Sequence, residues 1–282
     1  MSLSLDTPIE FKPLGLMVPE ALPAVTDGSP TARRFSGKVC VVTGAANGIG
    51  RSTAEVLDEF GARVIAVDID GAALSAAFDG THVTTFQADV STDGQALAAA
   101  LLDRFGTVGL LVNNVGVDSD HGFLDLSQAD FDRVFATNLR GPWFLTRGLI
   151  ERIVEDRRSG SIVFVSSLHD SFIRTVPHYS ASKAAVAMLV KELAHEFGPH
   201  GIRVNAVSPG FVPKAPVPLA VDTERDRIRA LIPLGRVGEP RQVAKVIAVL
   251  LCDQWSDYVT GANVRVDGGL SLHSWSVLES ER

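Results

Sequence analysis

Cysteine is scarce in this sequence, and long hydrophobic runs are absent from it. Two cysteines are too few for a disulfide framework; Cys40 lies inside the apolar run "KVCVVTG" and Cys252 ends a distant helical pattern, so we expect two buried thiols. No apolar stretch reaches the length of a membrane span, and no basic segment followed by an apolar signal core opens the chain. We therefore expect a soluble protein of a reducing, cytoplasmic compartment with no membrane partner.

Positive charge is also in the minority. Lysine and arginine number 26 against 33 aspartates and glutamates, which gives a formal net charge of −7. This acidic balance argues against a nucleic-acid partner. With 282 residues and 46% hydrophobic composition, the chain is nevertheless long enough to bury a large core.

Residues 1–36 differ from the remainder of the chain. They contain five prolines and no sustained hydrophobic periodicity, which predicts an extended or disordered N-terminal arm. Over residues 37–282, β-rich runs alternate with helical patterns, and we expect one domain there.

The β-rich runs are apolar along most of their length, as in "KVCVVTG", "RVIAVDI" and "SIVFVSS". Such strands are buried on both faces, which is typical of a parallel sheet covered by helices. The alternation predicts a single-domain α/β fold with a doubly wound, Rossmann-type sheet and ligands beyond the carboxyl ends of the strands. The helical patterns lie at residues 51–60, 93–105, 130–153, 179–197 and 240–251.

The first strand ends in "TGAANGIG", directly before a helical pattern. Gly44, Gly48 and Gly50 have no side chains, so the backbone can turn tightly and approach a pyrophosphate at the helix N-terminus. The second strand ends at Asp68, eighteen residues after Gly50, where a carboxylate can accept both hydroxyls of an adenosine ribose. Strand, turn, helix and acidic residue in this order predict a dinucleotide site.

The stretch "HYSASKAAVAML" places Tyr179 and Lys183 one helical turn apart. A lysine at that distance favours the ionised phenolate, which makes Tyr179 a candidate acid/base, although an isolated pair of this kind is more often an ordinary helix face. Apolar residues recur at helical spacing around the pair and predict one buried stripe. The stripe consists of Ala181, Ala184, Ala185, Met188, Leu189 and Leu193.

Six motifs in this order resemble those of the short-chain dehydrogenase/reductase family. They are "TGAANGIG", "NNVG", the serine pair at 166 and 167, "YSASK", "SPG" and "VDGG". The resemblance covers about residues 36–272. It implies an oxidoreductase that uses a nicotinamide cofactor and forms a homotetramer.

By this resemblance, Tyr179 is the general acid/base, and Lys183 favours its phenolate and binds the nicotinamide ribose. Asn138, in "FATNLRG", is similar to the asparagine that holds a water between the lysine and solvent.

Two residues fit the catalytic serine of the family. Ser166 lies thirteen residues before Tyr179, the separation found in most relatives. Alignment of the strand end selects Ser167 instead and implies a one-residue deletion in the following loop, where Asp170 replaces a glycine common in the family. We favour Ser167, because loops absorb deletions more easily than buried strands do.

On the cofactor side, the resemblance assigns contacts to the glycine-rich turn, to several strand ends and to the segment before residue 213. Asn47 and Ile69 occupy places where NADP(H)-dependent relatives usually carry a cation, and Arg51 is expected to point away from the ribose, so we expect NAD as the cofactor. The expected contacts are Gly44, Asn47, Gly48, Ile49, Gly50, Asp68, Ile69, Asp89, Val90, Asn114, Val115, Gly116, Tyr179, Lys183, Pro209, Gly210 and Val212.

Residues 211–236 resemble the substrate loop of the family. Lys214 and Arg174 border the expected cleft and could favour an anionic substrate, although two solvated cations are the commoner arrangement. His121 with Asp118 and Asp120 could suggest a metal site, but no second ligand cluster accompanies them, and we expect no metal.

The sequence therefore predicts an NAD(H)-dependent oxidoreductase that interconverts a secondary alcohol and a ketone, with a small-molecule alcohol or ketone as its partner. Two alternatives stay open. One is an NADPH-dependent reductase of 3-oxoacyl thioesters. The other is a non-catalytic, dinucleotide-binding regulatory protein, against which the intact pair of Tyr179 and Lys183 argues.

Overall fold

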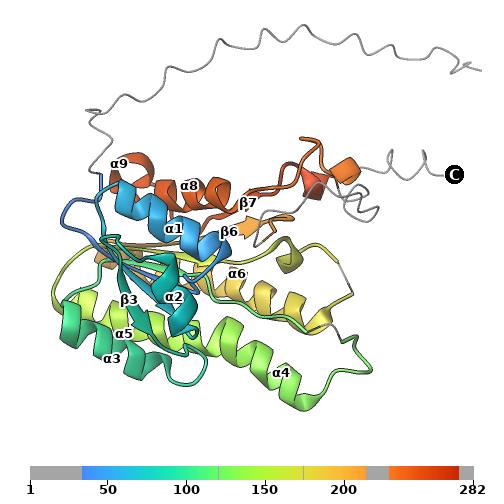
Figure 1. The fold of residues 1–282 in the computed structure, drawn as a ribbon, viewed down its shortest axis with the longest axis horizontal. Coiled ribbons are helices and arrows are strands. Elements are labelled where there is room, and N and C mark those ends of the chain that lie inside the picture. The colour runs from blue at the N-terminus through green and yellow to red at the C-terminus, as the bar shows by residue number, and fades with distance from the viewer. Residues whose placement is uncertain (1–33, 120, 174, 214–228, 273–282) are drawn as a thin grey trace, which may run out of the picture.

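The computed structural model describes residues 34–119, 121–173, 175–213 and 229–272. In this part of the chain a seven-stranded, all-parallel sheet with the order β3-β2-β1-β4-β5-β6-β7 lies between two layers of helices (Figure 1), which confirms the predicted fold. The elements are β1 Val39–Thr43, α1 Gly48–Glu59, β2 Arg63–Asp68, α2 Gly71–Ala77, β3 Thr84–Gln87, α3 Gly94–Phe105, β4 Leu110–Asn113, α4 Gln128–Phe135, a π-helical segment Ala136–Arg140, α5 Gly141–Glu155, β5 Gly160–Val165, a 3-10 turn Leu168–Asp170, α6 Pro177–Phe197, a 3-10 turn Gly198–His200, β6 Ile202–Pro209, α8 Pro240–Leu251, α9 Asp253–Ser256, β7 Asn263–Val266 and a 3-10 turn Leu270–Leu272.

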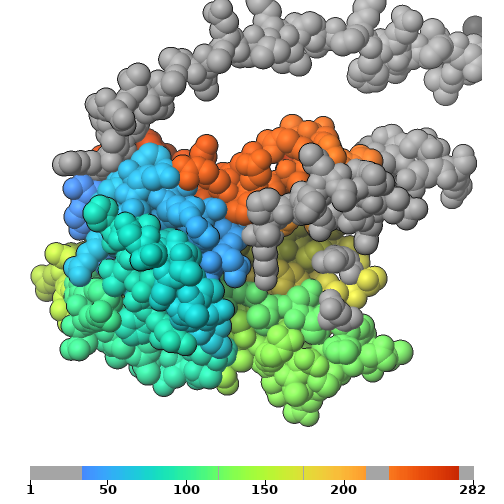
Figure 2. Space-filling view, in the orientation of Figure 1, coloured from blue at the N-terminus to red at the C-terminus, as the bar shows by residue number. Residues whose placement is uncertain are grey.

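The sheet separates two hydrophobic cores. Helices α1 and α8 pack together on one face, while α3 and α5 pack together on the other, with α6 beside β6. Along β1, Cys40 and Val42 belong to the first core and Val41 belongs to the second. Both faces of the strand are therefore buried, which explains why its sequence is apolar without alternation. In Figure 2, α1 in blue lies next to α8 in orange in the upper part of the molecule, and the green helices of the other layer lie below.

The structure bears on two features of the sequence, the scarcity of cysteine and the lack of long hydrophobic runs. Cys40 and Cys252 are both buried and unbonded, and burial raises the pKa of the Cys40 thiol, which confirms two buried thiols. Within the described ranges, no helix has the length and apolar character needed to cross a bilayer.

The packed domain begins within the segment predicted as an arm. Phe35 is buried in the first core, and its backbone N–H donates to the carbonyl of Phe60. Residues 1–33 of that segment lie outside the described residues.

The single helix predicted over residues 130–153 is wrong in one respect. The chain forms α4 and α5 with the π-helical segment between them, so the hydrogen-bonding pattern changes at Ala136 and again after Arg140. A π-helical turn inserts one extra residue into a helix and is frequent at functional sites. Asn138 lies in the middle of this segment and is buried.

The buried stripe predicted for α6 is also wrong. Of its six members only Leu189 is buried, and Met188 is 54% exposed. The face that packs on the sheet includes Ser182 and Lys183, polar residues that an apolar pattern does not count. Their hydrogen bonds to Tyr179 O and Val165 O allow polar groups to be buried at those positions.

Candidate active site

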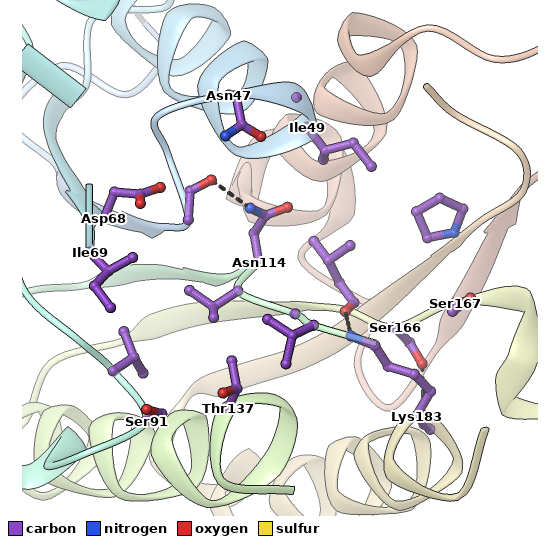
Figure 3. A pocket seen from close by; sticks show the side chains of 18 of the residues that line it. Asn47, Ile49, Asp68, Ile69, Ser91, Asn114, Thr137, Ser166, Ser167 and Lys183 are labelled. Carbon is purple, nitrogen blue, oxygen red and sulfur yellow. Dashed lines mark hydrogen bonds between the residues drawn. The ribbon is translucent and has the colours of Figure 1, made fainter. Parts of the chain in front are cut away.

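A cavity of about 600 Å³ opens at the carboxyl ends of the strands. Its lining brings together all of the site residues predicted from the sequence except Gly50 and Asn138. Figure 3 shows Asp68 and Ile69 at one end, Ser166, Ser167 and Lys183 at the other, and Asn114 between them. The cavity is therefore long enough to bring the predicted adenosine contacts and the predicted catalytic residues into one site.

The glycine-rich turn is held in place by the neighbouring strand. Asn114, directly after β4, donates from Nδ2 to the carbonyls of Thr43 and Gly44 at 3.0 Å each. Gly50 lies against the same turn: a Cβ at this position would lie 2.1 Å from the carbonyl oxygen of Gly44. Gly50 is therefore needed for close packing of α1 on the turn, although it does not line the cavity.

The N-terminus of α1 suits an anionic ligand. Asn47 precedes the helix with extended backbone, and its side chain makes no capping hydrogen bond. The first turn of α1 also has no acidic residue. Its backbone N–H groups and the positive end of the helix dipole therefore fit the pyrophosphate of a dinucleotide.

Asp68, at the end of β2, is oriented by two backbone groups. Its Oδ2 accepts from Ala46 N at 2.9 Å and its Oδ1 accepts from Asp70 N at 3.1 Å. Arg51 pairs through Nε with Glu55 Oε1 at 2.9 Å, on the exposed side of α1. Among the described residues, the cations that line the cavity are Arg133 and Lys183, and neither bonds Asp68.

Asp89 follows β3 in the same cavity. Its Oδ1 accepts from the backbone N–H of Ser91 at 2.8 Å and from the hydroxyl of Ser91 at 2.7 Å. Val90, the next residue, is buried. The carboxylate is therefore held in a fixed orientation beside the end of the cavity predicted for adenine.

Lys183 is buried on α6 and points at the end of β5. Its Nζ donates to the carbonyl of Val165 at 3.0 Å and lies 5.7 Å from the centre of the Tyr179 ring. Removal from water disfavours the ammonium and lowers the pKa of Lys183 to about 8. Gly116 leaves room for the ammonium, because a Cβ there would lie 3.1 Å from Nζ.

Tyr179 lies in the first turn of α6, which begins at Pro177. Proline suits the first helical position because the N–H it lacks would have no partner there. The ring of His169 packs edge-on against the Tyr179 ring, with centroids 5.8 Å apart. His178 is buried, and its Nε2 lies 2.9 Å from Ser119 Oγ, which ties the loop after β4 to the start of α6.

The two candidate serines have different surroundings. Ser166 is buried, and its hydroxyl donates to the backbone carbonyl of Lys183 at 3.2 Å. Ser167 is half-buried and caps the 3-10 turn, where its Oγ accepts from His169 N at 3.3 Å. Of the two serines, Ser166 donates its hydroxyl proton to a backbone carbonyl of α6, whereas the Ser167 hydroxyl accepts from a backbone N–H.

Asn138 supports the site from outside the cavity. Its Nδ2 donates to Val117 O at 2.9 Å and to Ser182 Oγ at 3.0 Å, and its Oδ1 accepts from Val117 N at 2.8 Å. The Ser182 hydroxyl in turn donates to the carbonyl of Tyr179 at 2.7 Å. The amide therefore holds the turn of α6 that carries the tyrosine and the lysine.

Several neighbours of the site were not expected from the sequence. Ser91, Arg133 and Thr137 line the cavity without a motif that marks them. The sequence suggested His121 as the histidine beside Asp118, but in the structure His178 contacts Asp118, with Nε2 3.3 Å from Oδ1.

In the described part of the chain no three His, Cys, Asp or Glu side chains are grouped as metal ligands. Lys214, Arg174, Asp120 and residues 214–228 of the substrate loop lie outside the described residues.

Comparison with known proteins gives consistent matches. The family model described as enoyl-(acyl carrier protein) reductase matches residues 44–271. The chain is 37% identical over 258 residues to a (3R)-3-hydroxyacyl-CoA dehydrogenase of Rattus norvegicus, covering 85% of this chain and 98% of the relative. It is 37% identical over 253 residues to an L-rhamnose 1-dehydrogenase (NAD(P)(+)) of Azotobacter vinelandii, covering 84% and 97% of the two chains. A short-chain type dehydrogenase/reductase from Mycobacterium marinum has a similar crystal structure, with a TM-score of 0.78, 30% identity, and 85% and 97% of the two chains covered.

Proposed function

Because the chain belongs to the short-chain dehydrogenase/reductase family, and is thus an oxidoreductase acting on hydroxyl or oxo groups, we propose that it interconverts a secondary alcohol and a ketone with NAD(H). The observation that carries the proposal is the buried Lys183 ammonium beneath the Tyr179 ring, in the same cavity as the glycine-rich turn. When bound, the nicotinamide would accept or supply the hydride.

The protein residues would move the proton and hold the substrate oxygen. Tyr179 takes the proton from an alcohol, or gives it to a ketone, as general base or acid. The Lys183 cation favours the phenolate form of Tyr179 by Coulombic attraction. Ser167 hydrogen-bonds the reacting oxygen and orients it toward Tyr179. Asn138 keeps the turn with Tyr179 and Lys183 in place through its hydrogen bonds to Val117 and Ser182.

We propose NAD(H) and not NADP(H) from the charge around Asp68. A 2′-phosphate would meet this carboxylate, and Arg51 is paired with Glu55. Like charges at short range repel, whereas a ribose hydroxyl can donate to the carboxylate.

Replacing Asp68 by alanine is expected to shrink the preference for NAD(H). The wild type should favour NAD(H) by at least about tenfold in kcat/KM, which corresponds to about 1.4 kcal/mol. The variant should use NADP(H) better, because the repulsive charge is gone. Initial rates with both cofactors measure the ratio. Asp70→Asn is the matched control, since Asp70 caps α2 outside the cavity. A wild type that already favours NADP(H) would contradict the assignment.

Separate Ser166→Ala and Ser167→Ala variants test the catalytic serine. Ser167→Ala is expected to lower kcat by about tenfold to a hundredfold, because a hydrogen bond to the reacting oxygen is lost. Ser166→Ala is expected to keep most of kcat and to lose about 1 kcal/mol of stability with the hydrogen bond to Lys183 O. Steady-state kinetics and urea unfolding measure both quantities. A larger loss of kcat at Ser166 would reverse the assignment.

An acyl thioester is the second candidate substrate. The relative from Rattus norvegicus is named for a 3-hydroxyacyl-CoA, which favours this class, while the relative from Azotobacter vinelandii is named for a sugar. A panel of 3-hydroxyacyl thioesters, sugars, steroids and small diols would separate the classes by kcat/KM.

The homotetramer expected from the family also remains a proposal. Apolar side chains on the outer surfaces of two helices support it: Trp143 and Phe144 on α5 and Met188 on α6 are 46%, 36% and 54% exposed.

A further inference from the structure

Asp170 stands where the family commonly has glycine, and its carboxylate joins three separate parts of the chain. Oδ2 accepts from Ser208 Oγ and from Asn263 Nδ2, each at 2.6 Å. Oδ1 accepts from Ser171 Oγ at 2.6 Å. Ser208 lies in β6 and Asn263 opens β7, so the carboxylate connects the loop after β5 to the next two strands of the sheet.

These contacts are built into the sheet. Ser208 is fully buried and also lies 2.7 Å from Asn263 Oδ1, so the three side chains form a closed triangle of polar groups. Arg265 of β7 donates to Ser171 Oγ at 3.0 Å and holds the outer side of the loop. Charge-assisted hydrogen bonds of this length are among the strongest in proteins.

The same residue closes the turn that carries Ser167. Asp170 N donates to Ser167 O at 3.0 Å, and the 3-10 turn begins directly after Ser167. Within this turn the backbone N–H of His169 donates to Ser167 Oγ. The orientation of the Ser167 hydroxyl therefore depends on a turn whose last residue is fixed to β6 and β7.

We propose that Asp170 is a positioning residue that holds Ser167 toward the substrate oxygen by fixing the 3-10 turn to β6 and β7. The inference rests on the proposed function and deepens it. A glycine at this position would offer no side chain to make this connection. Because small displacements of an orienting group lower the rate strongly, loss of the connection should act on kcat.

A double-mutant cycle tests the proposal. Wild type, Ser167→Ala, Asp170→Ala and the double variant are compared for kcat and KM with the best alcohol, for NADH affinity by fluorescence titration, and for melting temperature. We expect Asp170→Ala to lower kcat by about tenfold with unchanged NADH affinity. The double variant should be no slower than Ser167→Ala within about twofold, because residues that act through one group are not additive.

Three further variants separate positioning from stability. Asp170→Asn keeps an acceptor oxygen and should retain most of kcat. Asn263→Ala removes one donor to the carboxylate, remains informative if Asp170→Ala does not fold, and should lower kcat less than Asp170→Ala does. Asp156→Asn is the matched control, since Asp156 accepts from Thr107 and Arg152 away from the cavity; its kcat should equal that of the wild type.

Each outcome has a distinct meaning. The proposal would be overturned if the kcat losses of Ser167→Ala and Asp170→Ala multiplied in the double variant, or if Asp170→Ala kept the kcat of the wild type. In both cases the proposed function would stand. A wild type without hydride transfer would overturn the proposed function itself.

Discussion

Replacing Tyr179 by phenylalanine is expected to lower turnover by about 10²–10⁴-fold, the usual contribution of a general acid/base. Phenylalanine keeps the ring, so the edge-on contact with His169 and the position above Lys183 are preserved. Only the proton-transferring hydroxyl is removed. NADH affinity and the unfolding transition should therefore change little, and steady-state kinetics with the best alcohol measure the loss.

The chain offers a matched control for this substitution. Tyr258, the second of the two tyrosines, is fully exposed, and Tyr258→Phe should leave turnover unchanged. If Tyr179→Phe kept near wild-type turnover, another group would have to move the proton, and the proposed assignment would be wrong.

Replacing Lys183 by methionine is expected to change activity and stability in opposite directions. Turnover should fall by about 10²–10³-fold, because the phenolate of Tyr179 loses its cationic neighbour. The protein without cofactor should become more stable at pH 7 by about 1–3 kcal/mol, because a buried charge is replaced by an apolar side chain of similar length. Urea unfolding and initial rates measure the two effects.

The stability gain should depend on pH, and its sign follows from the pKa of Lys183. Burial lowers this pKa from 10.5 to about 8. Below about pH 8 the folded and unfolded states both bind the proton, and the penalty of about 3 kcal/mol for the buried ammonium is fully present. Between about pH 8 and 10.5 only the unfolded state keeps the proton, so wild-type stability rises and the advantage of the variant disappears.

Lys191→Met is the control for this prediction. Lys191 is an exposed residue of the same helix, so its replacement should change neither turnover nor the stability at pH 7 by a comparable amount. If the Lys183→Met variant were less stable than the wild type at pH 7, the prediction would be wrong. The stabilisation from the hydrogen bond to Val165 O would then exceed the cost of burying the ammonium.

Local patterns in the sequence predict the sheet, and most of the residues expected to contact the cofactor line one cavity. Strands buried on both faces, such as β1, give unbroken apolar runs, and Gly44, Gly50 and Asp68 lie at strand and helix ends where parallel topology requires them. The motifs also place Tyr179 and Lys183 one turn apart on α6. These features need only short-range spacing together with the order of elements.

Features that depend on long-range contacts could not be predicted in this way. The buried face of α6 contains Ser182 and Lys183, whose partners lie on other elements or on the helix backbone, so apolar periodicity selected the wrong stripe. Asp170 meets Ser208 and Asn263, which are 38 and 93 residues away in sequence. The π-helical segment around Asn138 changes hydrogen bonding without an obvious change in composition.

The function proposed for this site is hydride transfer between NAD(H) and a secondary alcohol, with Tyr179 moving the proton. The most direct test incubates wild type and Tyr179→Phe with NAD⁺ and a panel of secondary alcohols that includes 3-hydroxyacyl thioesters, sugars, steroids and diols, and follows the absorbance of NADH. We expect the wild type to form NADH with at least one class and Tyr179→Phe to form it at least about a hundredfold more slowly. NADH binding without NADH formation from any alcohol of the panel would contradict the proposed function and favour a non-catalytic dinucleotide-binding protein.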